Sequence, residues 1–184
     1  AFRIEQTGTP IALGVGSASY YASEGENRST GVELALKGAV TKWWDSSISY
    51  TYIHYKDITN GQTFDRYPPH SISLWQTVKI PVGLPEDLRV SLGYRFSAQY
   101  FATFRGTKIT TVPGQKADYT IPRYNIFDLV CELPIPSTDW TPECSIRLGI
   151  YNIFDQRYVA SLRHAAQCFA GDPRSFEIGL KMNF

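Results

Sequence analysis

The chain has 184 residues, a length that fits a single ordinary domain. Its 18 basic and 17 acidic side chains nearly cancel, which excludes a polyanion such as nucleic acid as the expected partner. Hydrophobic residues make up 43% of the chain, which excludes a disordered protein, and no stretch offers the roughly 20 mostly apolar residues of a membrane helix.

Apolar and polar residues alternate with a period of two along the chain, whereas helical periodicity is hard to find. Eight strands are predicted in chain order, at residues 1–6, 28–38, 42–57, 69–80, 87–101, 117–133, 143–157 and 173–184. The alternation is clearest in the last of them, where apolar residues flank Glu177, Gly179 and Lys181. The sequence therefore predicts an all-β fold. Its mean hydropathy of −0.22 does not report solubility, because the apolar and polar residues of alternating strands cancel in such an average.

The connections between the predicted strands alternate strictly between short and long. The short turns are 39–41, 81–86 and 134–142, and the long polar and aromatic loops are 7–27, 58–68, 102–116 and 158–172. Outer-membrane barrels have this pattern, with short periplasmic turns and long outer loops, whereas a soluble sandwich mixes hairpins with crossovers. Most of the predicted strands also reach the roughly 9–11 tilted residues of a bilayer crossing. The sequence therefore predicts an antiparallel up-and-down transmembrane β-barrel.

Each predicted strand has one apolar and one polar face. In lipid the apolar residues must point outward and the polar residues toward a lumen. The lumen would then hold Glu33, Lys37, Asp45, Arg89, Arg95, Asp128, Glu132, Arg147, Glu177 and Lys181. A closed barrel of eight strands fills its interior with side chains, so these charges favour a wider, wet lumen. The start at Ala1, without Met and within a strand, adds to the expectation of a processed chain or a piece of a longer one.

Five short motifs follow one another along the chain. They are N-R-S-T-G-V-E-L at 27–34, P-H-S-I-S-L-W at 69–75, P-R-Y-N-I-F-D at 122–128, Y-N-I-F-D-Q-R-Y at 151–158 and G-D-P-R at 171–174. In this order and spacing they resemble the C-terminal part of TonB-dependent outer-membrane receptors, in particular the siderophore receptors. The resemblance implies that residues 1–184 are about eight strands of a plugged barrel of about 22 strands. The plug domain and the N-terminal strands of that barrel are not in this sequence.

The resemblance also implies a function and partners. It implies a receptor in the outer membrane of a Gram-negative bacterium that imports ferric siderophores, with energy coupled through TonB. Its partners would be outer-membrane lipid, the missing strands and plug, the coupling protein acting through that plug, and the barrel assembly machinery. No enzymatic activity and no cofactor besides the transported ligand are expected. A receptor for haem, vitamin B12, nickel chelates or a glycan, a free-standing eight-stranded structural or adhesin barrel, and a soluble β-sandwich binding module are the alternatives.

Ligand contacts are expected from aromatic and arginine side chains in the lumen and the outer loops. Planar donors and π faces suit an iron–siderophore complex. The candidates are Tyr100, Phe104, Arg105, Tyr119, Arg66, Arg163 and Phe169. Neighbouring residues of the same character are Phe64, Tyr67, Phe101 and His164. For Tyr100 and Phe101, a place in the aromatic girdle at the membrane interface is favoured over ligand contact.

The end of the chain resembles the signal that the outer-membrane assembly machinery reads. That signal has a polar residue, a glycine two positions later, and hydrophobic residues at the third-from-last and last positions. Glu177, Gly179, Met182 and Phe184 fit it.

The cysteines and histidines predict no metal site. Cys131 and Cys144 are expected on the apolar face, on either side of the 134–142 turn, and both a disulfide and two free thiols stay open. Cys168 has no second cysteine in its loop. The histidines, His54, His70 and His164, lie on separate elements without metal-ligand spacing.

Overall fold

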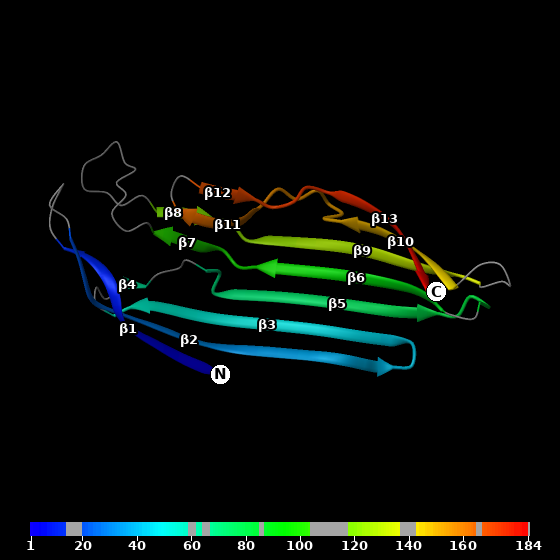
Figure 1. Cartoon of the computed structure of the whole chain (residues 1–184), viewed down its shortest axis with the longest axis horizontal. Coiled ribbons are helices and arrows are strands. Elements are labelled where there is room, and N and C mark those ends of the chain that lie inside the picture. Colours follow the sequence, from blue (N-terminus) through cyan, green and yellow to red (C-terminus); the bar gives the residue numbers. More distant parts are fainter. Residues whose placement is uncertain are drawn as a thin grey trace.

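The described part of the chain is a sheet of long antiparallel strands with two small hairpins at one end (Figure 1). A computed structural model describes residues 1–13, 20–58, 62–63, 67–84, 87–103, 118–136, 143–164 and 167–183. The main path of the sheet contains β1 (Phe2–Leu13), β2 (Tyr20–Thr41), β3 (Trp44–Asp57), β5 (His70–Ile80), β6 (Leu88–Ser97), β9 (Tyr124–Ile135), β10 (Glu143–Tyr151) and β13 (Ser175–Asn183). Each of these strands pairs with the next one in this order, so the predicted antiparallel all-β fold is confirmed. Among these residues, no helix is long and apolar enough to cross a membrane.

The remaining strands lie in the long connections. β4 (Gln62–Thr63) pairs with β3, while β7 (Tyr100–Thr103) pairs with β8 (Asp118–Ile121) and β11 (Val159–His164) with β12 (Gln167–Ala170). Figure 1 shows both small hairpins at the end of the sheet opposite the turns that join β2 to β3 and β5 to β6. Long and short connections therefore alternate in space as predicted.

The strand ends differ from the prediction in three ways. The predicted 7–27 loop is mostly strand, because β1 continues to Leu13 and β2 begins at Tyr20. The predicted strands 87–101 and 117–133 are interrupted at 98–99 and 122–123, where Pro122 has no N–H for a ladder bond. The predicted strand 143–157 ends at Tyr151, because the next residue, Asn152, has a φ of 51°, which no strand accommodates.

The strand register joins the apolar residues of neighbouring strands into one continuous surface, here called the apolar face. One row runs Leu36, Ile48, Leu74, Tyr94, Phe127, and another runs Leu92, Leu129, Ile150, Phe176. Many of these side chains are exposed, such as Phe176 at 72%, Ile178 at 83% and Leu36 at 57%. So large an exposed apolar surface is typical of a protein that contacts a membrane or a partner.

The opposite surface, here called the polar face, carries the charges and the most buried residues. Asp128, Ser91, Ser97 and Ser145 are buried there. Ile126 is the largest fully buried side chain in the described residues, and it lies on this face, opposite Arg95 in the register. The polar face of the described residues therefore buries polar groups beside Ile126, while the apolar face exposes many large apolar side chains, which is unlike a soluble domain. The two faces are those that the alternation predicts.

Gly31 lets two strands and an aromatic ring approach closely. A Cβ atom added at Gly31 would lie 2.1 Å from the backbone carbonyl oxygen of Tyr52 and 2.7 Å from Cζ of Phe2. Phe2 is the register partner of Gly31, so its ring covers the glycine from β1. The glycine in the 27–34 motif is therefore a packing requirement.

Candidate functional site

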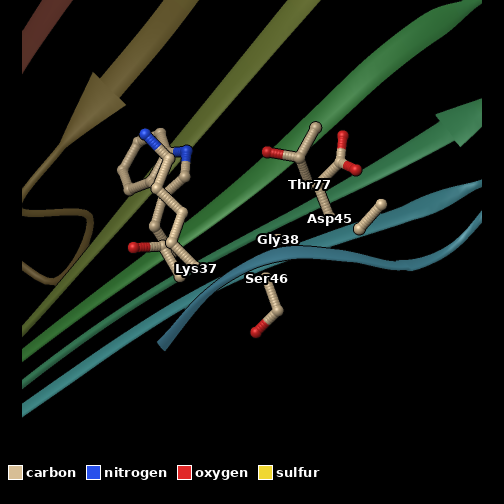
Figure 2. Close-up of a pocket in the computed structure, with 8 residues that line it drawn as sticks. Lys37, Gly38, Asp45, Ser46 and Thr77 are labelled. Atoms are coloured by element: carbon tan, nitrogen blue, oxygen red, sulfur yellow. The ribbon is translucent and has the colours of Figure 1, made fainter. Parts of the chain in front are cut away.

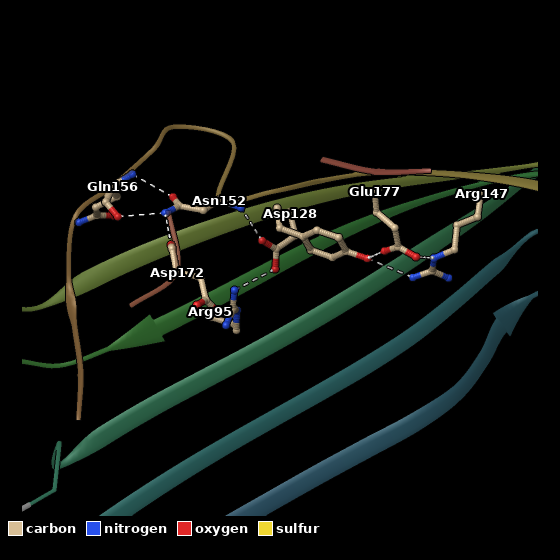
Figure 3. Close-up of polar contacts among 8 residues, drawn as sticks. Arg95, Asp128, Arg147, Asn152, Gln156, Asp172 and Glu177 are labelled. Atoms are coloured by element: carbon tan, nitrogen blue, oxygen red, sulfur yellow. Dashed lines mark hydrogen bonds and ion pairs between the residues drawn. The ribbon is translucent and has the colours of Figure 1, made fainter. Parts of the chain in front are cut away.

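A chain of polar contacts crosses the polar face near the small hairpins (Figure 3). Asp128 on β9 is its centre, with a side chain only 7% exposed. Its Oδ2 atom lies 3.3 Å from Nη2 of Arg95 on β6, and its Oδ1 atom accepts the backbone N–H of Asn152 at 2.8 Å. A buried carboxylate needs such charged and hydrogen-bonding partners. Asp128 thus connects an arginine on the polar face to the segment that follows β10.

Asn152 anchors the segment that leads from β10 into the β11–β12 hairpin. Its Nδ2 group donates to the carbonyl oxygens of Gln156 and Asp172, at 3.0 Å each, and its Oδ1 atom accepts the N–H of Gln156 at 2.9 Å. Residue 152 is only 3% exposed. Gln156 in turn accepts the N–H of Asn125 on β9 at 3.1 Å. One amide side chain therefore connects the two ends of the hairpin to each other, beside β9.

Aromatic contacts hold the same segment against β9. The rings of Tyr124 and Tyr158 lie 4.5 Å apart between centroids, and those of Phe127 and Phe154 lie 5.5 Å apart, edge to face. The N–H of Gly171 donates to the carbonyl oxygen of Tyr158 at 2.8 Å. These distances are those of favourable aromatic pairs.

Three of the five sequence motifs, at 122–128, 151–158 and 171–174, therefore meet at one place. We call it the hairpin junction and define it as Asp128, Asn152, Asp155, Gln156, Tyr158 and Gly171. Asp155 completes it, because its Oδ1 atom accepts the N–H of Arg174 at 2.9 Å. The sequence singled out these motifs only by resemblance, and it did not indicate that they contact each other.

Pockets open along the polar face. One of about 470 Å³ lies beside the hairpin junction and is lined by Arg95, Tyr151, Asn152, Asp172, Pro173 and Ser175. Another of about 320 Å³ lies toward the short turns, where Figure 2 shows Lys37, Asp45 and Thr77 around it. Asp45 there pairs with Lys79 at 2.7 Å. Both pockets mix charged, hydroxyl and apolar side chains, which suits a wet surface that contacts other polar groups.

Within the described residues, no group of three His, Cys, Asp or Glu side chains could hold a metal ion.

A second polar cluster joins β10 and β13 (Figure 3). Arg147 Nε lies 3.3 Å from Glu177 Oε1. The hydroxyl group of Tyr151 donates a hydrogen bond to Glu177 Oε2 and accepts one from Arg147 Nη2 at 3.4 Å. The two charged side chains are each 42% exposed, so water screens their attraction.

We expect this ion pair to contribute less than about 1 kcal/mol to stability. A double-mutant cycle with Arg147→Ala and Glu177→Ala, measured by urea unfolding of the full receptor, checks this. The Arg95→Ala/Asp128→Ala cycle is the matched comparison and should give a larger coupling, because Asp128 is buried. Equal couplings would contradict the expectation.

The predicted ligand residues are only partly within the described structure. Phe104, Arg105, Arg66 and Phe64 lie outside the described residues, and the side chains of Tyr119, Arg163, Phe101 and His164 are also outside the description. Phe169 on β12 is exposed, as is Tyr67. Of the seven candidates, only Tyr100 and Phe169 have side chains that the structure describes, and the ligand role of the set stays a prediction.

Tyr100 is buried. It is 5% exposed, at the start of β7 and beyond the end of β6. Burial, with Tyr124 and Cys168 nearby, raises the pKa of its hydroxyl above the ordinary value. A girdle ring is exposed to lipid, so this burial contradicts the girdle interpretation of Tyr100. It also leaves little of the ring for a ligand in this arrangement.

The structure contradicts a disulfide between Cys131 and Cys144, which are both free. In the β9–β10 register Cys144 is opposite Ile135, four residues beyond Cys131, and Cys131 is opposite Leu148. Four residues of strand span about 13 Å, and a disulfide needs Cα atoms within about 7 Å. Both thiols lie on the apolar face as predicted, since their partners are apolar. Cys168 is also free, and it is exposed.

The residues of the predicted assembly signal lie on β13, except Phe184, which is outside the described residues. Glu177 lies on the polar face, Gly179 is the register partner of Arg147, and Met182 is 46% exposed on the apolar face. Their role in assembly stays a prediction.

Comparisons with known proteins place this geometry in a family. Residues 1–153 match the family model described as "TonB dependent receptor-like, beta-barrel". The ferrioxamine B receptor of Salmonella typhimurium is 29% identical over 95% of this chain and 24% of its own length. A probable TonB-dependent siderophore receptor of Acinetobacter baumannii, PiuA, is 27% identical over 85% of this chain and 20% of its own length.

A solved structure has the same fold. The ferripyoverdine receptor of the outer membrane of Pseudomonas aeruginosa, bound to ferripyoverdine, superposes with a TM-score of 0.78 at 18% identity. The superposition covers 99% of this chain and 24% of that one. At this identity the likeness concerns the fold alone. The chain thus spans about a quarter or less of the length of these proteins.

Proposed function

Because the chain belongs to the TonB-dependent receptor-like β-barrel family, we propose that it forms part of the wall of an outer-membrane receptor that imports ferric siderophores. In this proposal residues 1–184 are the C-terminal part of the barrel domain. The plug domain and the other strands come from the rest of the protein. The receptor acts by binding and transport, without covalent chemistry.

The exposed apolar face is the observation that carries the proposal. An aliphatic and aromatic surface that crosses seven paired strands, with the buried polar groups behind it, suits a wall between lipid and a wet lumen. The short turns then lie on the periplasmic side and the β7–β8 and β11–β12 hairpins outside. The chain would be located in the outer membrane of a Gram-negative bacterium, with lipid on one face and the plug against the other.

The open sheet favours part of a larger barrel over a free-standing one of eight strands. In a closed barrel the first and last strands pair with each other. In the described part of the sheet β1 pairs only with β2, and β13 only with β10. The adhesin or structural barrel is therefore the weaker alternative.

The names of the relatives support a ferric siderophore as the transported ligand. The two relatives described above are named for a siderophore or for siderophores in general. Energy would reach the receptor from a TonB-type protein through the plug, and assembly would use the signal around Phe184. The candidate loop residues, Arg66, Phe104, Arg105, Tyr119, Arg163 and Phe169, would then contact the ligand from the outer side.

Transport assays on the full receptor test the proposal. Deletion of its gene should abolish uptake of at least one radioiron-labelled siderophore in a panel that includes ferrioxamine B and a catecholate. The full-length gene should restore uptake, except in a strain without TonB. Haem and vitamin B12 uptake are the controls. If siderophore uptake is unchanged by the deletion and either control is lost, the substrate assignment is overturned.

A further inference from the structure

Three hydrogen-bonded side chains interrupt the apolar face near the short turns. The indole N–H of Trp44 donates to Oε1 of Gln76 at 2.9 Å, and Nε2 of Gln76 donates to Oγ of Ser46 at 2.9 Å. In Figure 2 the side chain of Ser46 points to the side of the sheet opposite Asp45 and Thr77, which lie on the polar face. Amide and hydroxyl groups therefore lie within a surface that is otherwise aliphatic and aromatic.

A hollow adjoins these side chains on β2. Gly38 is the register partner of Ser46, and Ser46 is the register partner of Gln76. A Cβ atom added at Gly38 would meet nothing within 4 Å. Leu36 and Val40, on the same face of β2, are 57% and 53% exposed, so the glycine leaves a gap between two projecting aliphatic side chains. We call Gly38, Ser46 and Gln76 together the polar notch.

The polar notch has donors to offer. A glutamine amide has two N–H donors, and a serine hydroxyl has one O–H donor. The amide oxygen of Gln76 accepts from Trp44, one of its N–H groups donates to Ser46, and Ser46 takes part only as an acceptor. These two bonds do not use the second N–H of Gln76 or the O–H of Ser46. An unsatisfied donor is costly in apolar surroundings, so the notch suits a ligand that brings an acceptor.

The depth of the polar notch matches the ester groups of a phospholipid. Trp43 and Trp44 stack with their ring centroids 6.3 Å apart at the end of β3, and tryptophans at this position occupy the membrane–water interface. Ser46 lies two residues further along β3, which is about 5 Å deeper at a strand tilt near 40°. The interfacial region of one leaflet is about 5–8 Å thick. The ester carbonyl groups lie at its inner border, where the headgroup meets the acyl chains.

We propose that the polar notch binds one phospholipid of the periplasmic leaflet through an ester carbonyl group. The inference rests on the proposed function, since it needs the apolar face to contact lipid and the short turns to lie on the periplasmic side. The O–H of Ser46 and the free N–H of Gln76 donate to the carbonyl oxygen, and the acyl chain lies in the gap at Gly38. The gap between Leu36 and Val40 suits one acyl chain better than the broad surface of a second protein. The charge of the headgroup plays no part in this recognition.

The test compares an ester lipid with its ether analogue, which lacks only the carbonyl oxygens. The full receptor in detergent is titrated with dioleoyl phosphatidylcholine and with the corresponding dioleyl ether lipid, and binding of the first lipid is followed by native mass spectrometry. The ester lipid should bind about tenfold more tightly, since the equivalent of about 1.4 kcal/mol is within the contribution of two hydrogen bonds. Ser46→Ala/Gln76→Leu should remove this preference. Gly38→Leu fills the gap and should weaken both lipids by a similar factor.

The matched control is Tyr94→Phe/Asn125→Leu. It also removes a hydroxyl and an amide from the apolar face, because the hydroxyl of Tyr94 donates to Oδ1 of Asn125 at 2.9 Å, but it does so far from the short turns. Its preference for the ester lipid should stay within twofold of that of the natural protein.

Three results would overturn the proposal. They are equal affinity of the natural protein for the ester and ether lipids, an unchanged preference in Ser46→Ala/Gln76→Leu, and an equal loss in the control. A dimer that dissociates in Ser46→Ala/Gln76→Leu, without any lipid preference, would assign the notch to a second copy of the protein instead. Heat-modifiable migration on gels shows that each variant is folded. Siderophore uptake, measured separately, distinguishes failure of this proposal from failure of the transport function, because uptake can persist without a lipid at the notch.

Discussion

Replacing Gly31 with alanine is expected to lower the free energy of unfolding of the full receptor by about 3 kcal/mol, at the upper end of the cost of overpacking. The new methyl carbon would lie 2.1 Å from the backbone oxygen of Tyr52. A backbone atom cannot rotate away as a side chain can, so β2 and β3 must separate locally or bend. The ring of Phe2, at 2.7 Å, would also be displaced. Urea unfolding in detergent micelles, followed by tryptophan fluorescence, measures the change.

Gly38→Ala is the matched control for this prediction. Gly38 lies on the same strand, and a Cβ atom there meets nothing within 4 Å. Its substitution should change stability by less than about 0.5 kcal/mol. If both variants lose the same stability, the loss reflects a general property of alanine in β2, and the close approach at Gly31 is not its cause.

Asn152→Ala is expected to cost about 4 kcal/mol and to release the β11–β12 hairpin from the wall. The substitution removes three side-chain hydrogen bonds and leaves the carbonyl oxygens of Gln156 and Asp172 without this donor at a buried position. It also places alanine at a φ of 51°, which costs about 1 kcal/mol or more. Hydrogen exchange of residues 159–170 should therefore accelerate together with the loss of global stability.

Two further variants separate these causes. Asn152→Gly accepts the positive φ but loses the hydrogen bonds, so it should recover only about 1 kcal/mol relative to alanine. Asn152→Asp keeps an acceptor for the N–H of Gln156 but cannot donate to the two carbonyl groups, and it adds a charge near Asp128. It should be at least as unstable as the glycine variant. If Asn152→Gly had the same free energy of unfolding as the natural protein, backbone conformation alone would explain the effect of Asn152→Ala.

The sequence predicted the wall well because one physical signal determines it. Leu36, Ile48 and Leu74 alternate with polar neighbours on three strands, and that alternation gives strand, face and pairing at once. The prediction failed at the extension of β1 to Leu13 and at the hairpin strands β11 and β12, whose sequences have no clean alternation of apolar and polar residues.

The hairpin junction was not predictable in the same way. Asp128 and Asn152 are 24 residues apart, and Asn152 and Asp172 are 20 apart, so no local pattern shows that they touch. The signal accessible in the sequence was the residue type at positions 152 and 155, since asparagine and aspartate tolerate the positive φ that both residues adopt. The disulfide alternative failed for a related reason. Cys131 and Cys144 flank one turn, but β9 continues four residues past Cys131 before the register reaches the partner of Cys144.

The anchoring of the β11–β12 hairpin makes its tip an exchangeable module. Hydrogen bonds hold the hairpin at its base, through Asn152, Gln156, Tyr158 and Gly171, and each of them uses at least one backbone atom. We therefore expect the segment between Tyr158 and Gly171 to tolerate changes of sequence and length while the base keeps the hairpin attached. A graft that keeps residues 151–158 and 171–174 and replaces the segment between them should therefore fold, which offers a route to receptors of altered ligand preference on one unchanged wall.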